Sequence, residues 1–255
     1  MSDDVLMTSV ADGIGRIRLN RADKRNAINE PLARAILAAM EEFDADDAVR
    51  VIVVEGTDGS FCAGADMGEA LAAAEAGDRR FNPSRDAASR VASSEKPTIA
   101  AIDGPAYGAG ALLACGCDLR VVSDRSRFRF PGSEYGLVVG AAALTSLVGP
   151  VLAKELIFTS RPVDTDEALR IGLVNRVVPV AQFEEAVREL AAAVAAASPL
   201  AARWAKQVIN AAATGGDASG IEMQADLILR GGADHIERFG HATARVTGRG
   251  SSNGS

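Results

Sequence analysis

The sequence has little of several features that mark particular classes of protein. No run of lysine and arginine stands out among its 255 residues, and the net charge is −7, whereas a nucleic-acid-binding surface normally carries a basic patch. No apolar run approaches the roughly 18 residues of a membrane span. The acidic start MSDDVLMTSV lacks the apolar stretch of a signal peptide. We therefore expect a cytoplasmic protein with no nucleic-acid and no membrane partner.

Cysteine and histidine are also scarce. The three cysteines, an odd number, are Cys62, Cys115 and Cys117. The C-x-C spacing of the last two is neither a C-x-x-C redox pair nor half of a usual zinc site, so we predict three buried thiols of a reducing compartment and no metal site. The two histidines, His235 and His241, lie near the end of the chain, far in sequence from the glycine-rich turns described below.

Strand-like and helix-like segments alternate along most of the chain. A hairpin is expected over residues 5–10 and 14–19, turning at Ala11–Gly13. Short, nearly all-apolar runs predict buried strands at 49–55 and 98–102, and further strands are expected at 118–124 and 173–179. Helical spacing is expected at 31–44 with Asn29 as the cap, from about Asp66, from about Gly108, and at 141–149, 154–159 and 165–171. This alternation predicts an α/β fold with crossover units and a largely parallel sheet.

The last quarter of the chain has a different pattern. From about Gln182 the sequence is helical almost to the end, and Ser198–Pro199 starts a new helix within it. We predict an α/β core over residues 1–197 and a helical region over 198–246. The polar, Gly/Ser-rich stretch 247–255 is expected to be a disordered tail.

Two glycine-containing turns are the strongest candidates for chemistry. FCAGAD (61–66) follows one predicted strand and GPAYGAG (104–110) follows the next. The second turn contains G-x-G, but Leu113 replaces the third glycine of the dinucleotide fingerprint, which disfavours a nucleotide site. Two strand–turn–helix units can instead aim two backbone N–H groups at one oxygen, as an oxyanion hole does. The alternative is that the small residues only let helices pack closely on strands.

Four segments, in order over roughly residues 15–180, resemble the enoyl-CoA hydratase/isomerase (crotonase) family. NRADKRNAIN is similar to its motif R-P-x-x-x-N-A-L, and FCAGAD to F-x-A-G-A-D. AAIDGPAYGAGALLACGCDLRVVSD is similar to its glycine-rich motif ending in C-D-x-R-x-A, and ALRIGLVNRVVP to A-x-x-x-G-L-V-x-x-V-V-P. The resemblance implies a spiral of ββα units whose C-terminal helical region supports trimers, often paired into hexamers. It also implies an acyl-CoA thioester as the ligand, with coenzyme A as part of the substrate and no separate cofactor.

The resemblance assigns roles to particular residues of this chain. The two oxyanion-hole amides fall on Ala65 and Ala109. The positions implied to contact the substrate or its coenzyme A moiety are Arg25, Ala27, Ala63, Asp66, Met67, Tyr107, Gly108, Gly132 and Tyr135.

The chain departs from the family where the hydratases carry their two catalytic glutamates. Leu112 and Gly132 stand at these positions, and neither side chain can transfer the protons that hydration requires. Glu134 is our best candidate for a replacement, with a surface glutamate in a turn as the alternative. Three functions stay open: an enzyme that stabilises an enolate, a non-catalytic acyl-CoA-binding protein, or another reaction such as decarboxylation or thioester hydrolysis.

Overall fold

A hairpin opens the main sheet. In the computed structural model, which describes residues 4–247, β1 (Leu6–Ala11) and β2 (Ile14–Leu19) pair antiparallel. The turn between them places Asp12 at φ 52° and Gly13 at φ 79°, the left-handed pair of a two-residue hairpin. The predicted hairpin is confirmed.

Four further strands extend this sheet in parallel, in the order β1-β2-β3-β4-β6-β8. They are β3 (Val51–Glu55), β4 (Thr98–Ile102), β6 (Leu119–Ser123) and β8 (Arg176–Val178). Strands β3 and β4 are buried along their whole length, as expected for parallel strands covered on both faces. The predicted α/β class with a largely parallel sheet is therefore confirmed.

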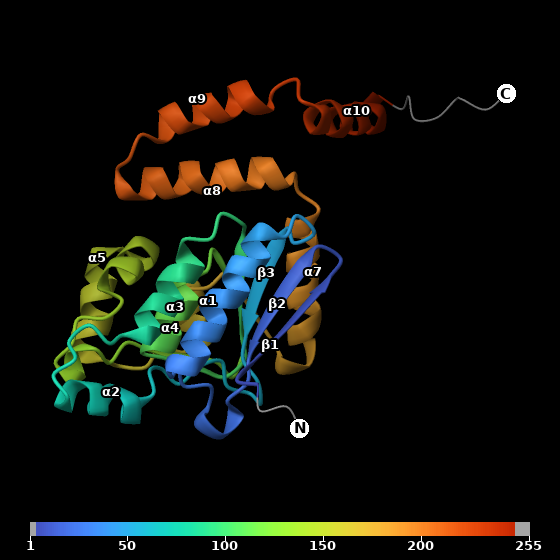
Figure 1. The fold of residues 1–255 in the computed structure, drawn as a ribbon. Helices are drawn as coiled ribbons and strands as arrows, with labels where there is room; N and C mark the ends of the chain where they lie inside the picture. Colours follow the sequence, from blue (N-terminus) through green and yellow to red (C-terminus); the bar gives the residue numbers. More distant parts are fainter. Residues whose placement is uncertain (1–3, 248–255) are drawn as a thin grey trace. The chain divides into compact units, whose positions relative to one another are not determined.

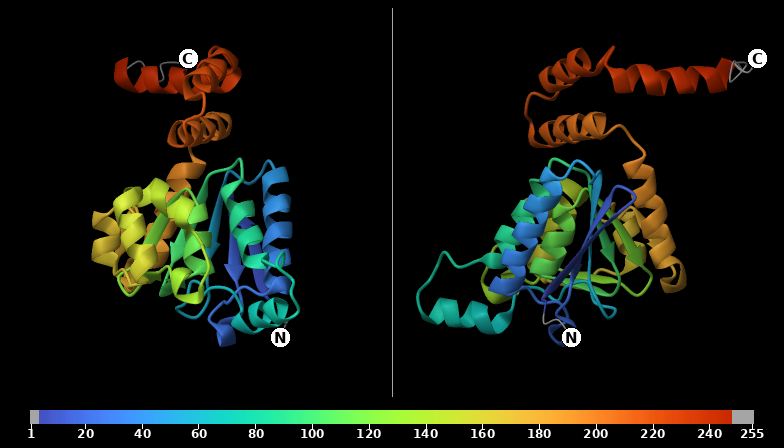
Figure 2. Two further views of the ribbon diagram at one scale, coloured as in Figure 1. Left: turned by 90° about the vertical axis from the view of Figure 1, so that its left-hand side faces the viewer. Right: turned by 45° about the vertical axis from the view of Figure 1, so that its right-hand side comes forward.

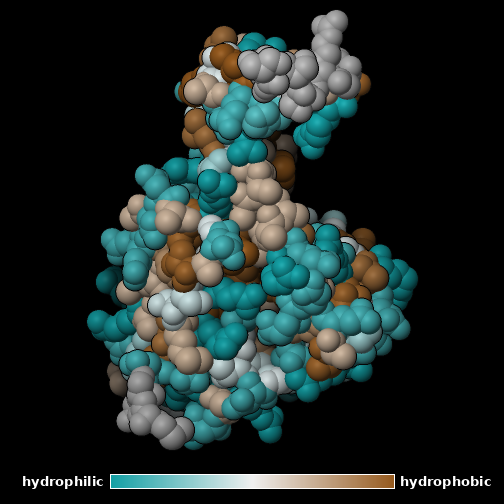
Figure 3. All heavy atoms as spheres, turned by 90° about the vertical axis from the view of Figure 1, so that its right-hand side faces the viewer, coloured by the Kyte–Doolittle hydropathy of each residue, from teal (hydrophilic) through white to brown (hydrophobic). Residues whose placement is uncertain are grey.

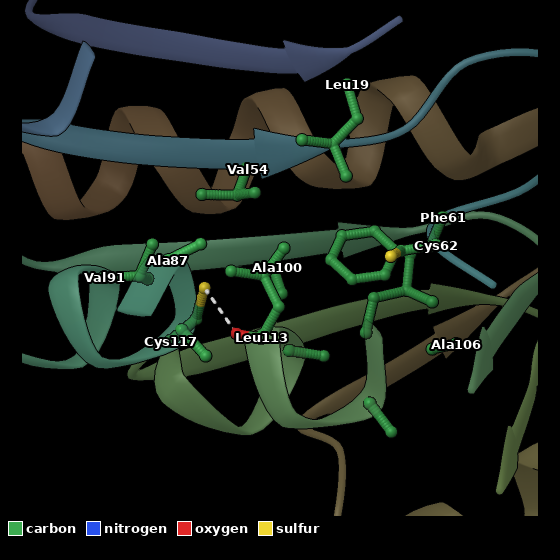
Figure 4. Close-up of a cluster of buried hydrophobic side chains, with 14 of the residues drawn as sticks. Leu19, Val54, Phe61, Cys62, Ala87, Val91, Ala100, Ala106, Leu113 and Cys117 are labelled. Carbon is green, nitrogen blue, oxygen red and sulfur yellow. Dashed lines mark hydrogen bonds between the residues drawn. The ribbon is translucent and has the colours of Figure 1, made fainter. Parts of the chain in front are cut away.

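Helices cover both faces of the sheet (Figures 1 and 2). On one face the core is shared with α1 (Glu30–Ala45), α3 (Pro83–Ala92) and α4 (Ala109–Gly116), and on the other with α7 (Phe183–Ala195). Asn29 caps α1 as predicted, accepting a hydrogen bond from the amide of Leu32. Figure 4 shows part of the first core, where the buried Cys117 thiol donates to the carbonyl of Leu113 at 3.7 Å.

A second, two-stranded parallel sheet was not foreseen from the sequence. Strand β5 (Pro105–Tyr107) pairs with β7 (Arg127–Arg129). Each strand has only three residues, which is too short to show the alternation of apolar and polar side chains that identifies a strand in a sequence. The remaining short elements of the first 182 residues are η1 (Ala22–Lys24), α2 (Met67–Glu75), η2 (Ser133–Tyr135), α6 (Thr165–Arg170) and η3 (Val180–Gln182).

Helix α5 (Ala141–Thr159) is broken in the middle (Figure 1). Gly149 has φ 77° and ψ 165°, which is not helical, and Pro150 follows it. The break agrees with the two short helices predicted here. Taken as one helix, however, α5 has a mean hydropathy of 1.5 over an 18-residue window and passes a length-and-composition test for a membrane span, which the sequence reading did not anticipate. Such a break interrupts the backbone hydrogen bonds that a straight span relies on.

The described residues group into two compact units that divide between Ala196 and Ala197. The second unit consists of α8 (Pro199–Thr214), α9 (Ala218–Leu229) and α10 (Ala233–Thr247). Large apolar side chains are exposed on it, and Figure 3 shows hydrophobic residues on its surface. These side chains are Leu200, Ile209, Met223, Leu227, Ile228, Ile236, Phe239 and Val246. The tail predicted for 247–255 lies outside the described residues except for Thr247, which ends α10.

Candidate functional site

The two glycine-containing turns meet beyond the carboxyl ends of β3 and β4. The amide of Cys62 donates to the carbonyl of Pro105 at 3.1 Å, and the amide of Tyr107 donates to the carbonyl of Cys62 at 3.0 Å. Helix α4 starts directly after this pairing and packs on the same segment. A Cβ atom added at Gly110 would lie only 2.2 Å from the Cys62 carbonyl oxygen, so glycine is required for this approach.

Ala65 carries the first candidate donor. Residues 64–66 pair with Ile28: the Ile28 amide donates to the Gly64 carbonyl at 2.8 Å, and the Asp66 amide donates to the Ile28 carbonyl at 2.9 Å. In such a parallel pairing the intervening residue directs its own N–H and C=O to the opposite side. The Ala65 N–H therefore points away from Ile28, and within residues 4–247 it has no hydrogen-bond partner.

Ala109 carries the second candidate donor. It is the first residue of α4, and its preceding residue, Gly108, has φ 51° and gives no side-chain cap. The Gly108 carbonyl accepts from the Leu112 amide at 3.0 Å, which starts the helix and leaves the Ala109 N–H unused in the described part of the chain. A Cβ atom at Gly64 would lie 3.7 Å from the Ala109 nitrogen. The structure thus brings the two predicted donor segments together.

Asp66 holds the first of these segments in place. Its Oδ2 accepts from Nη1 and Nη2 of Arg21, each at 3.1 Å, while Oδ1 caps α2 by accepting from the amides of Gly68 and Glu69. Burial alone would raise the pKa of Asp66, but the Arg21 guanidinium and the two amides outweigh it and hold the pKa below its ordinary value. The carboxylate predicted to contact the ligand is therefore engaged within the protein.

Asn26 is a buried residue of the first family motif to which the sequence analysis gave no role. It lies in the left-handed region at φ 57°. Its side chain accepts from the amide of Arg21 at 2.9 Å and donates to the carbonyls of Thr57 and Ser60 at 3.2 and 2.7 Å. The neighbouring Arg25 carbonyl accepts from the Ala63 amide at 3.0 Å. Asparagine adopts the left-handed conformation more readily than most residues, so the sequence already offered a reason to single out this position.

The predicted coenzyme A contacts Arg25 and Ala27 lie in this same segment. Arg25 is exposed and Ala27 is half-buried. The Ala27 carbonyl accepts from Nη1 of Arg21 at 2.6 Å. Met67, another predicted contact, follows the first turn and is 63% exposed at the start of α2.

The two positions where the family has glutamates, 112 and 132, both border the segment Val139–Gly140. A Cβ atom at Gly140 would lie 3.7 Å from Cδ1 of Leu112, and one at Gly132 would lie 3.3 Å from Cβ of Val139. A Cβ atom at Gly108 would lie 3.9 Å from Pro131, so the chain leading into Gly132 borders the start of α4. The surroundings of both positions are apolar or backbone.

Position 132 leaves little room for a larger residue. A Cβ atom there would lie 3.0 Å from the carbonyl oxygen of Leu137 and 3.2 Å from the amide nitrogen of Val139. Both contacts are tighter than nine in ten real Cβ contacts. The loop after η2 therefore occupies the space through which a side chain at 132 would extend.

Glu134 and Tyr135 lie in η2, and both are exposed. Oε2 of Glu134 accepts from Nη2 of Arg129 at 2.5 Å. Arg129 also donates from Nε to the carbonyl of Ser160 at 2.7 Å, and its own carbonyl accepts from the Gly108 amide at 2.9 Å. Glu134 is thus tied to the strand that supports the Ala109 loop, but its carboxylate already has a partner.

Acidic and metal-ligating side chains do not gather at this site. Across the part of the chain that the structure describes, no group of three or more His, Cys, Asp or Glu side chains is arranged to hold a metal ion. Cys62, which lies between the two turns, is fully buried, and burial raises the pKa of its thiol to about 12. The Cys62 thiol is therefore held in its neutral form beside the two candidate donors.

Comparisons with known proteins agree with this architecture. The sequence model of the enoyl-CoA hydratase/isomerase family matches residues 9–237. A probable enoyl-CoA hydratase (echA6) of Mycobacterium leprae is 38% identical over 208 residues, which are 78% of this chain and 80% of the relative. A probable mitochondrial enoyl-CoA hydratase 2 of Arabidopsis thaliana is 35% identical over 83% of this chain and 72% of its own length.

Solved structures show the same fold. A crystal structure of an enoyl-CoA hydratase from Bacillus anthracis superposes with a TM-score of 0.86 at 27% identity, covering 94% of this chain and 96% of that chain. The fold is thus that of the crotonases, a class whose sheet and C-terminal helices correspond to those described above. The chain belongs to the enoyl-CoA hydratase/isomerase family.

Proposed function

We propose that the protein binds an acyl-CoA thioester with the carbonyl oxygen between the N–H groups of Ala65 and Ala109. The observation that carries the proposal is the pair of unused donors, set on two segments that approach each other at Gly64. Two N–H groups aimed at a carbonyl oxygen stabilise the negative charge that it gains when the thioester becomes an enolate. Small residues around both donors let a ligand reach the backbone.

The coenzyme A moiety would lie along the segment that contains Arg25. This guanidinium is exposed and has no hydrogen-bond or ion-pair partner among the described residues, so it is free to pair with a phosphate of the ligand. Ala63 and Ala27 flank it and carry no side chain that would obstruct the ligand.

We do not expect the protein to hydrate an enoyl thioester rapidly. Hydration needs one group to activate water and another to protonate the α-carbon, and Leu112 and Gly132 can do neither. Glu134 would have to leave its ion pair with Arg129 before it could exchange a proton with a ligand. The remaining candidate chemistry is enolate stabilisation, or a decarboxylation or thioester hydrolysis in which the oxyanion hole supplies most of the catalysis.

Binding without turnover is the second candidate function. The same two donors would hold the thioester, and the loss of both acids favours this reading directly. A crotonyl-CoA assay discriminates between the two: binding is measured by calorimetry and hydration by loss of the enoyl absorbance. We expect binding with hydration far below that of a two-glutamate enzyme. Rapid hydration would show that an acid elsewhere serves the site.

A proline substitution tests the donor itself. Ala109→Pro removes the N–H, and proline is well tolerated at the first position of a helix because that N–H has no intrahelical partner. We expect the variant to fold and to lose most of the carbonyl polarisation of a bound CoA ester, read as the shift of its carbonyl stretch. Ala233→Pro is the matched control, since Ala233 also opens a helix after a glycine. A full shift in Ala109→Pro would remove Ala109 from the proposed site.

We also propose that the protein assembles into a homotrimer, or a hexamer of two trimers, through its C-terminal helices. The large apolar side chains exposed on α8, α9 and α10 support this, because patches of this kind usually mark protein interfaces. A monomer by light scattering at micromolar concentration would contradict the proposal.

A further inference from the structure

A buried positive charge lies at the carboxyl end of α4, opposite Ala109. Arg120 lies in β6 and is 3% exposed. Its Nη1 donates to the carbonyl of Cys117 at 2.7 Å and to that of Ala114 at 3.3 Å, both at the carboxyl end of α4. Its Nε donates to the carbonyl of Leu173 at 2.6 Å. The guanidinium therefore closes the end of the helix opposite Ala109.

No carboxylate among the described residues forms an ion pair with this guanidinium. Within residues 4–247, the hydrogen bonds of the Arg120 side chain go to the three backbone carbonyls, and it forms no ion pair. An arginine is almost never fully buried unless it is paired, because removing its charge from water is costly. The desolvation penalty of a buried charge can exceed what its local contacts return. Capping alone therefore does not account for a full positive charge here.

The charge lies on the axis of the helix that presents the donor. Helix α4 has eight residues, so it spans about 12 Å. Its peptide dipoles direct their positive end to the Ala109 N–H and their negative end to Arg120. At an effective dielectric constant of about 20, one positive charge roughly 15 Å from an anionic oxygen strengthens its binding by about five- to tenfold.

Hydrogen bonds to two neighbouring segments fix the chain just after the carboxyl end of α4. The Asp118 carboxylate, just after the helix, accepts from the amide and the hydroxyl of Thr98 at 2.7 and 2.9 Å. The amide of Arg120 itself donates to Oδ1 of Asn175 at 2.8 Å. The guanidinium is thus fixed between α4 and the segments at 173 and 175.

We propose that Arg120 is a positioning residue of the oxyanion hole: it fixes α4 by its carboxyl end and, by its charge, strengthens the Ala109 N–H as a donor to the thioester oxygen. The inference rests on the proposed function, since it assigns a task to a residue behind that same site. It is separate from the glutamate positions and from the coenzyme A contacts.

Two variants separate the charge from the hydrogen bonds. Arg120→Gln keeps an amide donor for the carbonyls but removes the charge, whereas Arg120→Lys keeps the charge with fewer donors. Lys96→Gln is the matched control. Lys96 is also buried, and its Nζ donates to the carbonyls of Phe43 and Asp46 at 2.6 and 2.5 Å at the end of α1. Lys96 caps α1 rather than α4, so this variant reports the loss of a buried capping cation at a helix that does not present the Ala109 donor.

The readout is the carbonyl stretch of a CoA ester labelled with carbon-13 at the thioester carbonyl, measured bound and free. We expect the shift in the wild-type protein to persist in Arg120→Lys and Lys96→Gln and to fall by a third or more in Arg120→Gln, with affinity for an enolate-like ligand reduced five- to tenfold. Equal shifts in folded Arg120→Gln and wild type would overturn the inference. If Arg120→Gln does not fold, a folded Arg120→Lys that has lost the shift would overturn it equally. No shift in the wild-type protein would instead refute the proposed function.

Discussion

Gly110 sets the distance between α4 and the segment that carries the other donor. Replacing it with alanine adds one Cβ atom, which would lie 2.2 Å from the carbonyl oxygen and 2.7 Å from the Cβ of Cys62. Neither neighbour is the free end of a flexible side chain, because Cys62 is fully buried between the two turns. The helix and the segment must therefore separate to accommodate the methyl group.

The size of the effect follows from two opposing terms. Alanine in place of glycine inside a helix is worth up to about 1 kcal/mol. Relieving the contact needs a shift of roughly 1 Å, and overpacking of this kind costs about 1–3 kcal/mol or somewhat more. We expect Gly110→Ala to lower the free energy of unfolding by about 1 kcal/mol. A displacement of 1 Å at a donor pair can also cost on the order of a hundredfold in rate enhancement.

The assay combines urea unfolding with the carbonyl stretch of a bound CoA ester. Gly240→Ala is the control, because Gly240 lies in α10 and an added Cβ atom meets nothing within 4 Å. This control should raise the free energy of unfolding by about 0.5–1 kcal/mol. Gly110→Ala should instead lower stability and lose most of the carbonyl shift. A Gly110→Ala protein that is as stable as wild type and retains the shift would refute the close approach and the donor geometry built on it.

Four further predictions follow from the same structure. Ser160→Gly should raise the free energy of unfolding by about 1 kcal/mol in urea titrations, because Ser160 has φ 51° and, among the described residues, a buried hydroxyl with no partner; a loss of stability would contradict this. Arg21 lowers the pKa of Asp66, so the ionised carboxylate stabilises the fold fully above about pH 4, and this contribution is lost as the pH falls through the folded-state pKa. The urea midpoint of Asp66→Asn should therefore vary less than that of wild type between pH 5 and pH 3. Gly132→Glu should destabilise by about 1–2 kcal/mol without accelerating crotonyl-CoA hydration, because backbone atoms lie 3.0 and 3.2 Å from the added Cβ; faster hydration would show that the loop yields. Cys62, with a thiol pKa of about 12, should remain unmodified by iodoacetamide in the folded protein at pH 8, as read by mass spectrometry.

Local sequence chemistry was enough to predict most of the main fold. The Asn29 cap and the left-handed Asp12–Gly13 turn are written in single residues, and the buried strands in short apolar runs. Strands β5 and β7 could not be predicted in this way, because three-residue strands are defined by their partner rather than by their own pattern.

The candidate site was only partly predictable. The resemblance located Ala65 and Ala109, and the structure brings their segments together. It could not reveal that the loop after η2 closes position 132 or that Arg129 engages Glu134. These contacts join residues that are not related by the regular spacing of a helix or a strand, so the sequence pattern does not predict them. Arg120 belongs to a motif that was noticed, but the sequence alone could not show that its side chain reaches back to the end of α4.

Helix α2, which follows Ala65 and Asp66, has no buried residue, and this has a consequence for its stability. Unfolding this helix would expose almost no new apolar surface, so its opening free energy comes from its own hydrogen bonds, the Asp66 cap and the bond that Glu69 accepts from the Glu30 amide at 2.8 Å. Amide hydrogen exchange should therefore be orders of magnitude faster in α2 than in α4. If the protein binds CoA esters as proposed, the ligand would meet donors held by α4 and the core, while α2, directly after Ala65 and Asp66, could open without exposing core residues.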